Sequence, residues 1–195
     1  GLGDVYKRQG WFYHPEEDTD VRTAGELLDI YLDAVGANAS LLLNIPPDTH
    51  GRIAAPDCAS LAELGAKIRQ IFASNVTEKA AITADSAIAQ HPITQAVDGM
   101  ADTYWQAAYG QESDTITLKF QKPQKVSCVV LGEHLPTGQR IESGEIWADG
   151  SKASEFTVVG HKRICRFTPV DVQTLTIKIT ASRTEPTLRL LEVYQ

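Results

Sequence analysis

The sequence predicts two folds in one chain, an α/β segment followed by an all-β domain. Between residues 10 and 75, helical apolar spacing alternates with short apolar runs, which is typical of β-α-β-α order. From residue 76 onward, short runs of alternating apolar and polar residues recur between turn residues, which indicates an antiparallel β-sandwich. The composition, 43% hydrophobic and 22% charged, is ordinary for a globular chain of 195 residues.

The net charge argues against one class of partner. The chain carries a formal charge of −7, and an acidic protein has no long-range attraction for phosphate backbones, so we expect no nucleic acid partner. No apolar run approaches the roughly 18 residues of a membrane span, so none is expected. The three cysteines, Cys58, Cys128 and Cys165, lack C-x-x-C spacing and are predicted to be small buried residues.

The α/β segment is predicted to begin with a strand at residues 11–14, "WFYH", which Pro15 ends. A helix follows, in which Thr23 and Glu26 have the spacing of a capping box. Gly36 is predicted to end this helix in the left-handed conformation.

A second strand and a second helix complete this segment. Residues 40–45, "SLLLNI", show no polar alternation, as expected of a parallel strand covered on both faces. The helix is predicted over residues 57–74, with Asp57 as its N-cap. Because two strands cannot form a stable parallel sheet, the segment is predicted to be the end of a larger α/β domain.

The second half is predicted to consist of short strands. Turns are expected at residues 136–138 and 149–150, and no amphipathic helix of three turns is found after residue 76. The predicted strands cover residues 114–120, 125–132, 144–149, 155–160, 163–168, 174–180 and 188–194.

These residues resemble two known families. The runs "GWFYHPEED" and "LLLNIPPDTHGRI" are similar to the C-terminal end of the catalytic barrel in glycoside hydrolase family 29, the α-L-fucosidases. The runs "AVDGMADTYWQA" and "LRLLEVY" resemble a discoidin-like, or coagulation factor 5/8 type C, domain. The resemblance implies a piece of a (β/α)8-type barrel at residues 10–75, followed by a galactose-binding-like jelly roll at residues 78–195.

The resemblance also implies a function. Family members use an Asp nucleophile and a Glu acid/base in a retaining mechanism, and both would lie upstream of residue 10. We therefore expect no catalytic residue in this chain, no cofactor for catalysis, and no activity of the chain alone. Residues 1–9, "GLGDVYKRQ", are interpreted as a foreign leader, similar to translated adapter sequence.

The whole enzyme would be a secreted or periplasmic bacterial α-L-fucosidase. It would remove terminal, α-1,3/1,4-linked fucose, and its partners would be fucosylated glycans. Two alternatives remain open: a non-catalytic carbohydrate-binding sandwich attached to another glycosidase, and a different retaining glycosidase with a similar barrel end.

Substrate-binding candidates lie in the aromatic run. In a barrel the active site forms at the carboxyl ends of the strands, so Trp11, Tyr13 and His14 are predicted to line it, with barrel packing as the alternative. Asn44 and Asp48 are interpreted as turn residues after the next strand. The acidic residues 16–18 are interpreted as the solvated start of a helix, because neighbours in an extended segment point to opposite faces.

In the sandwich, the resemblance implies a structural Ca²⁺ held by Asp98, Asp102, Thr103 and Glu192. Met100 departs from the family pattern, and an ordinary Asp-Gly turn is the alternative. For sugar binding, His91, His134 and Arg140 are loop candidates. Four aromatic residues are available as well, of which Trp105 and Trp147 are expected in the core: Tyr104, Trp105, Tyr109 and Trp147.

Overall fold

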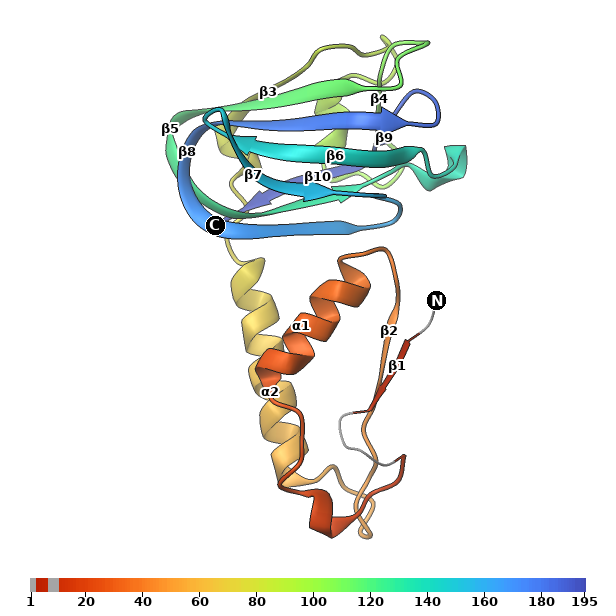
Figure 1. The fold of residues 1–195 in the computed structure, drawn as a ribbon, viewed down its shortest axis with the longest axis vertical. Helices are drawn as coiled ribbons and strands as arrows, with labels where there is room; N and C mark the ends of the chain where they lie inside the picture. The colour runs from red at the N-terminus through yellow and green to blue at the C-terminus, as the bar shows by residue number, and fades with distance from the viewer. Residues whose placement is uncertain (1–2, 7–10) are drawn as a thin grey trace. The chain divides into compact units, whose positions relative to one another are not determined.

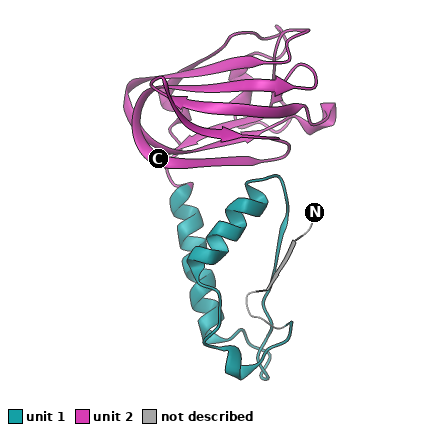
Figure 2. Cartoon of the chain, viewed as in Figure 1, with its two compact units in different colours: residues 1–71 teal, residues 72–195 magenta. Residues whose placement is uncertain are grey.

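The structure is a computed structural model that describes residues 3–6 and 11–195. The chain forms two compact units, residues 1–71 and residues 72–195 (Figure 2). The sequence predicted that the first segment ends at residue 75 and the second begins at residue 78. None of the helices in these described ranges is long and apolar enough to cross a membrane. Each unit is described by itself below.

Unit 1 has the order β1, α1, β2, α2. Strand β1 (Gly3–Tyr6) pairs in parallel with β2 (Leu41–Asn44), so that Tyr6 lies opposite Asn44. A short 3-10 turn, η1 (Pro15–Glu17), precedes α1 (Ala24–Val35), and α2 (Ala55–Ile71) ends the unit. The parallel pairing of two strands in a β-α-β order agrees with the prediction.

The first strand does not lie where the aromatic run predicted it. Residues 11–14 are irregular, and Trp11 and Phe12 are 53% and 73% exposed. The partner of β2 is residues 3–6 instead, within the segment interpreted as foreign. Aromatic residues favour strands only where a pleated surface half-buries them, and this run has no such surface.

The ends of the two helices differ in part from the prediction. The capping box is present: Glu26 N donates to Thr23 Oγ1 at 3.3 Å, and Thr23 N donates to Glu26 Oε2 at 2.8 Å. Gly36 is right-handed, with φ −74°, and Asn38, with φ 69°, takes the left-handed position instead. Asp57 is the third residue of α2 rather than its N-cap, because the helix begins at Ala55.

Unit 1 has a small core. Ala24 and Leu27 of α1 pack with Leu64 of α2. Strand β2 was predicted to be buried on both faces, but its Leu42 is 57% exposed, so one face of the strand is not buried within unit 1. Cys58 is exposed, contrary to the prediction of a buried residue.

Unit 2 is antiparallel throughout (Figure 1). Its main sheet has the order β10-β5-β8-β6-β7, with β3 also paired to β5, and β4 pairs with β9. The strands are β3 (Ala80–Ala84), β4 (Trp105–Gln106), β5 (Asp114–Gly132), β6 (Ile141–Ala148), β7 (Ser151–Phe156), β8 (Arg163–Ser182), β9 (Thr187–Leu188) and β10 (Leu190–Tyr194). Three short 3-10 turns complete the unit: η2 (Thr77–Lys79), η3 (Ile93–Ala96) and η4 (Leu135–Thr137).

Two pairs of predicted strands are single long strands. Residues 114–120 and 125–132 both belong to β5, and residues 163–168 and 174–180 both belong to β8. Their pairing shifts register between Lys119 and Gln124, and Figure 1 shows both strands curving there through the two layers of the sandwich. The strand predicted at 155–160 is displaced: β7 covers Ser151–Phe156, so only Glu155 and Phe156 of the predicted range lie in it.

One hydrophobic core fills the sandwich. Trp105, Ile116 and Ile177 are completely buried in it, and Cys165 joins the same cluster. Cys128 is buried as well, so the prediction holds for two of the three cysteines. Trp147, expected in the core, is only partly buried, because it alternates with the buried Ile146 and Ala148 and so lies on the other face of the sheet. The ammonium of Lys178 lies 4.2 Å from its ring centroid.

Candidate functional site

The aromatic run of unit 1 lies at the carboxyl ends of two parallel strands. It follows β1, and Asn44, the last residue of β2, donates from Nδ2 to the carbonyl oxygen of Trp11 at 3.0 Å. The Trp11 side chain remains 53% exposed. Asn44 therefore fixes the backbone at Trp11, and the indole is accessible to a ligand.

Tyr13 and His14 face the acidic turn rather than Asn44. The Tyr13 hydroxyl donates to Asp18 Oδ2 at 3.4 Å, and His14 Nδ1 lies 3.8 Å from Glu16 Oε1. Glu16 is exposed, as expected of a solvated turn, but Glu17 Oε2 is buried and accepts no hydrogen bond within the described ranges. The role of Trp11, Tyr13 and His14 in substrate binding stays a prediction.

Asp48 forms a turn after β2, as expected. Its Oδ1 accepts hydrogen bonds from the backbone N–H groups of His50 and Arg52, both at 2.8 Å. These bonds, that from Arg52 foremost, hold the pKa of the Asp48 carboxyl below its ordinary value. The geometry is that of a self-contained turn, which gives Asp48 a structural role.

Three aromatic side chains stack among the loops of unit 2. The Tyr104 ring lies between the imidazoles of His91 and His134, with centroid distances of 3.8 Å on both sides. His91 precedes η3, Tyr104 precedes β4 and His134 precedes η4. The stack therefore joins three loops, and all three of its residues are ones that the sequence suggested for sugar binding.

His134 lies in a positive environment. Burial lowers the pKa of His134, and the nearby positive groups His91, Arg189 and Arg140 lower it further, while Asp102 acts in the opposite sense. Its Nδ1 atom is buried and has no hydrogen-bond partner among the described residues. The folded protein thus favours the neutral imidazole.

We expect acid to weaken the sandwich through His134. Because the unfolded imidazole binds a proton more readily, stability is highest above about pH 6.5 and is lost as the pH falls below that value. Chemical denaturation of the protein at pH 7.5 and 5.5 would measure the loss. His134→Gln should reduce it. Equal losses in the His134→Gln and unmodified proteins would contradict this assignment.

The predicted calcium ligands are only partly assembled. Asp98 and Glu192 line one cavity of about 150 Å³, together with Asn75, Thr77, Glu78 and the 96–97 and 190–191 segments. Asp102 does not line it. Within residues 3–6 and 11–195, no three His, Cys, Asp or Glu side chains lie close enough to hold a metal.

The Asp98 loop is also closed on itself. Thr103 Oγ1 donates to both oxygens of Asp98, at 2.9 and 2.8 Å, and Met100 N donates to Oδ1 at 2.8 Å. Gly99 has φ 74°, as an Asp-Gly turn requires. The two carboxylates, Asp98 and Glu192, could contribute to an oxygen-ligated cation, but the turn explains the loop without one.

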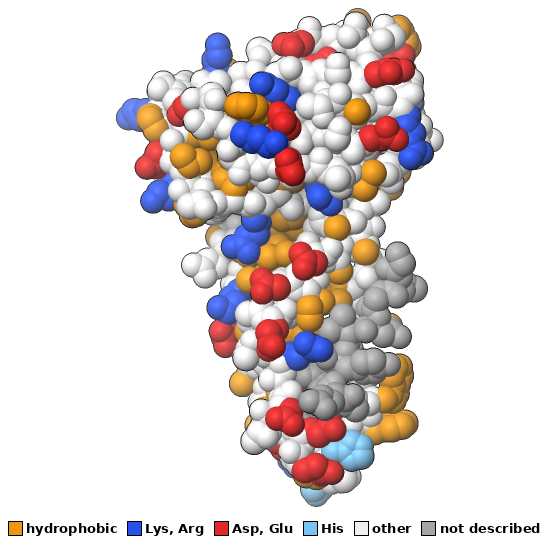
Figure 3. Space-filling model, in the orientation of Figure 1, with side chains coloured by type: hydrophobic (Ala, Val, Ile, Leu, Met, Phe, Trp, Pro, Cys, Tyr) orange, Lys and Arg blue, Asp and Glu red, His pale blue; other side chains and the backbone are white. Residues whose placement is uncertain are grey.

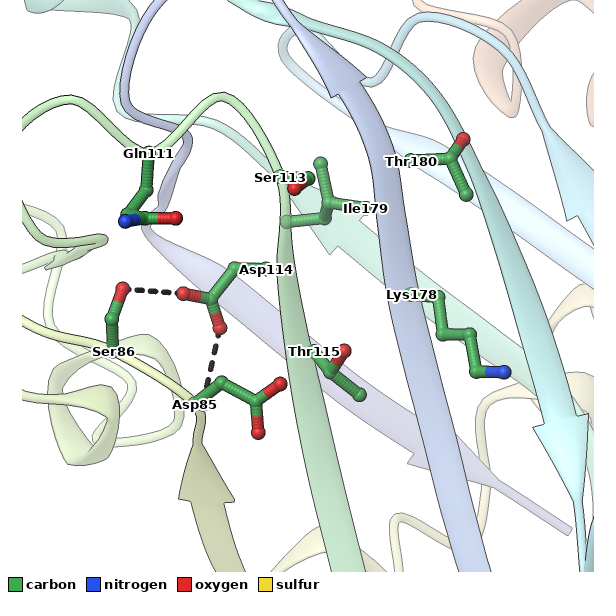
Figure 4. A pocket seen from close by; sticks show the side chains of 9 residues that line it. All are labelled: Asp85, Ser86, Gln111, Ser113, Asp114, Thr115, Lys178, Ile179 and Thr180. Atoms are coloured by element: carbon green, nitrogen blue, oxygen red, sulfur yellow. Dashed lines mark hydrogen bonds between the residues drawn. The ribbon is translucent and has the colours of Figure 1, made fainter.

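A larger cavity, of about 520 Å³, opens beside the first residues of β5 (Figure 4). The Asp114 carboxylate is buried in its wall, where it accepts hydrogen bonds from Ser86 Oγ at 2.5 Å and from Asp85 N at 3.2 Å. Burial raises the pKa of Asp114 above its ordinary value. The sequence did not suggest this site, because its residues come from three distant segments and form no motif.

Two family models match successive parts of the chain. Residues 81–190, more than half of the chain, match the F5/8 type C domain. The chain belongs to this family. Residues 4–70 match the α-L-fucosidase model, so both resemblances inferred from the sequence are confirmed. This match begins within residues 1–9, whose interpretation as a foreign leader lies partly outside the described residues and stays a prediction.

The relatives of this F5/8 type C protein are longer than the chain, which matches less than half of each. Alpha-L-fucosidase 1 of Arabidopsis thaliana is 31% identical over 203 residues, covering 98% of this chain and 40% of its own length. A crystal structure from Bacteroides thetaiotaomicron, assigned as an α-L-fucosidase, has a TM-score of 0.92 and 30% identity, covering 98% of this chain and 44% of that one. A Ruminococcus gnavus fucosidase in complex with fucose has a TM-score of 0.90 and 27% identity, covering all of this chain and 41% of that one.

Proposed function

We propose that this chain is the C-terminal part of a retaining α-L-fucosidase that hydrolyses terminal α-L-fucose from glycans. The observation that carries the proposal is the match of residues 4–70 to the α-L-fucosidase model, with the F5/8 type C domain directly after it. The chain spans about two fifths of the curated relative and of the solved structures that it resembles. The missing catalytic carboxylates would lie in the remaining part.

The geometry of unit 1 supports this proposal. A parallel pair with a helix after each strand is the repeating unit of a (β/α)8 barrel, and barrel active sites form at the carboxyl ends of the strands. Trp11 is at such an end, is exposed, and can stack on the apolar face of a sugar ring. His14 would donate a hydrogen bond to a sugar hydroxyl, and Tyr13 would hold the acidic turn through Asp18.

We further propose that fucosylated glycans are the partners of the whole protein, with α-1,3/1,4-linked fucose as the group removed. A secreted or periplasmic location follows from that substrate, since such glycans are found outside the cytoplasm. The neutral, hydroxyl-rich substrate also agrees with the surface seen in Figure 3, where acidic and basic side chains of the sandwich are intermixed on the visible face.

Activity assays on an aryl α-L-fucoside test the proposal. We expect no hydrolysis by the 195-residue chain, and hydrolysis by the complete protein encoded by the full reading frame. In that protein, Trp11→Ala should lower kcat/KM about tenfold, equivalent to about 1.4 kcal/mol of transition-state binding. Phe12→Ala is the matched control, because Phe12 is the more exposed neighbour and has no predicted role.

Two outcomes would count against this assignment. A complete protein without fucosidase activity would favour the alternative of a carbohydrate-binding sandwich attached to another glycosidase. Hydrolysis by the 195-residue chain that disappears in Glu17→Gln would show that the acid/base lies in the acidic turn instead.

We also propose that the cavity between Asp98 and Glu192 binds Ca²⁺. The support is that both carboxylates line one small cavity, although the Asp98 turn is complete without a cation. At a hundredfold excess over Kd, binding to the folded state stabilises it by about 2.7 kcal/mol, which corresponds to about 10 °C in melting temperature for this unit. Thermal melting in chelator and in millimolar Ca²⁺ measures the shift.

Variants can distinguish the proposed Ca²⁺ ligands from neighbouring residues by their calcium-induced shift in melting temperature. Asp98→Ala and Glu192→Ala should each remove most of the calcium-induced shift. Asp102→Ala should keep it, because Asp102 does not line the cavity. Identical melting curves with and without Ca²⁺ in the unmodified protein would reduce the loop to an ordinary turn.

A further inference from the structure

Strands β3, β7 and β10 lie at edges of the main sheet of the sandwich, and they differ in how far they are protected from pairing with another chain. An unprotected edge presents free backbone N–H and C=O groups, which are a template for a further strand. We propose that β3 is a dimerisation edge, at which β3 of a second copy of this chain pairs antiparallel across a two-fold axis.

The edges at β10 and β7 are protected. Along β10, Val193 N donates to Thr77 Oγ1 and the Val193 carbonyl oxygen accepts from Val76 N, both at 2.8 Å, so the chain before β3 occupies this edge. The pairing of β7 with β6 contains a register shift, and β7 carries the exposed charges of Lys152 and Glu155. Bulges and charged side chains are common means by which proteins keep edge strands from pairing.

The edge at β3 has neither kind of protection. Its five residues, AAITA, include no charge and no Pro, and they pair with β5 without a register shift. Figure 4 shows β3 ending beside β5 at Asp85. Because Asp85 N donates to the Thr115 carbonyl oxygen at 3.0 Å, the alternation of an antiparallel ladder turns the N–H and C=O groups of Ile82 and Ala84 away from β5. Within the described ranges, these outward groups form no hydrogen bond.

The sequence around β3 is complementary to itself. In a two-fold pairing centred on Ile82, Ala81 lies opposite the partner's Thr83, and Lys79 lies opposite the partner's Asp85. An isologous interface repeats each contact, so an ion pair would flank the new ladder at each end. Lys79 and Asp85 are both exposed, and neither forms an ion pair with any other residue that the structure describes.

The side chains at this edge suit a neighbouring strand. Ala81 and Thr83 are small and exposed, so they do not obstruct the approach of a second sheet. Ala80, Ile82 and Ala84 are only partly buried against the core, and a neighbouring strand would remove more of their surface from water. Because one short strand buries less than the roughly 1,200 Å² of a stable interface, we expect a weak dimer, with Kd on the order of 100 μM.

Sedimentation equilibrium of the 195-residue chain tests the proposal. Between about tenfold below and about tenfold above the expected Kd, the unmodified chain should pass from monomer to dimer. Lys79→Asp and Asp85→Lys should each raise Kd at least about tenfold, because like charges then face each other at both ends of the ladder. These two variants change the net charge in opposite directions, so a common loss of dimer cannot come from net charge. The double variant, which exchanges the two charges, should restore the original Kd.

Lys152→Asp is the matched control, because it makes the same change of charge as Lys79→Asp but at the protected β7 edge. Its Kd should equal that of the unmodified chain. A second probe acts on the backbone: Ala84→Pro removes an N–H that points away from β5, so it leaves the ladder with β5 intact and should raise Kd at least about tenfold.

Hydrogen exchange locates the contact. The N–H groups of Ile82 and Ala84 would donate across the interface, so their exchange should slow as the protein concentration rises. Those of Ala81 and Thr83 are already directed at β5 and should change little. A chain that stays monomeric over this range, a dimer whose Kd is the same in Lys79→Asp and Asp85→Lys, or unchanged exchange at Ile82 and Ala84 would each overturn the inference. None of these results bears on the fucosidase proposal, which is tested by hydrolysis.

Discussion

Glu133→Ala is expected to remove a large part of the stability of the sandwich. The Glu133 side chain is 1% exposed, and its carboxylate accepts three backbone hydrogen bonds. Oε1 accepts from Arg140 N at 2.7 Å and Ile141 N at 2.9 Å, and Oε2 accepts from Gly160 N at 2.6 Å. Hydrogen bonds to a charged group contribute about 1.5–3 kcal/mol each, and their loss would leave buried donors unsatisfied. We expect a loss of about 3–5 kcal/mol, against a typical total of about 5–15 kcal/mol.

Urea denaturation would measure this loss, with two further variants for comparison. Glu133→Gln keeps one carbonyl acceptor and should be intermediate between Glu133→Ala and the unmodified protein. Glu142→Ala is the matched control: its carboxylate forms an exposed ion pair with Arg183 at 2.8 Å, and its removal should cost less than about 1 kcal/mol. A Glu133→Ala protein as stable as the Glu142→Ala protein would show that water replaces the carboxylate as acceptor.

The sequence predicted most of the antiparallel strands of the sandwich, but it missed β3 and misjudged several strand lengths. Alternation identified the inward residues Ile116 and Leu118 because one face of the sheet is buried and the other is not. The sequence predicted two separate strands, at 114–120 and 125–132, whereas the chain bends between them and continues as β5. A bend with a register shift and a turn both favour exposed polar residues, so only the pairing partner distinguishes them.

The candidate sites show a second limit of prediction from the sequence: local motifs can be predicted, but sites built from distant segments cannot. The capping box at Thr23 and the Asp98 turn depend on neighbours within a few residues. Local spacing predicted the capping box, and it gave the turn as the alternative to a Ca²⁺ site. The cavity at Asp114 depends on segments that are far apart in the sequence. Before folding, Asp114 is an ordinary polar residue at the start of a strand, and only tertiary packing buries its carboxylate.

Unit 2 is expected to fold without unit 1, whereas unit 1 is not expected to fold alone. Its strands close on one core that includes Trp105, Leu131 and Leu191, all almost completely buried. Among the described residues, unit 1 has a two-stranded sheet and a core cluster of Ala24, Leu27 and Leu64. Trp11, Leu42 and Ile53 are about half exposed. Two strands without a larger hydrophobic face are not stable alone. Residues 72–195 should therefore unfold cooperatively in urea, and residues 1–71 should show no cooperative transition.

The start of the folded unit can be tested in the same experiment. Val76 is completely buried in the sandwich core, and its N–H donates to the Val193 carbonyl at 2.8 Å. The Thr77 hydroxyl accepts a hydrogen bond from Val193 N at 2.8 Å. A chain beginning at residue 78 loses these groups and should be about 2–4 kcal/mol less stable than one beginning at residue 72, since it opens a cavity and leaves Val193 unpaired. Equal urea midpoints for the two chains would place the boundary at 78, and a cooperative transition only in residues 1–71 would assign independent folding to the other unit.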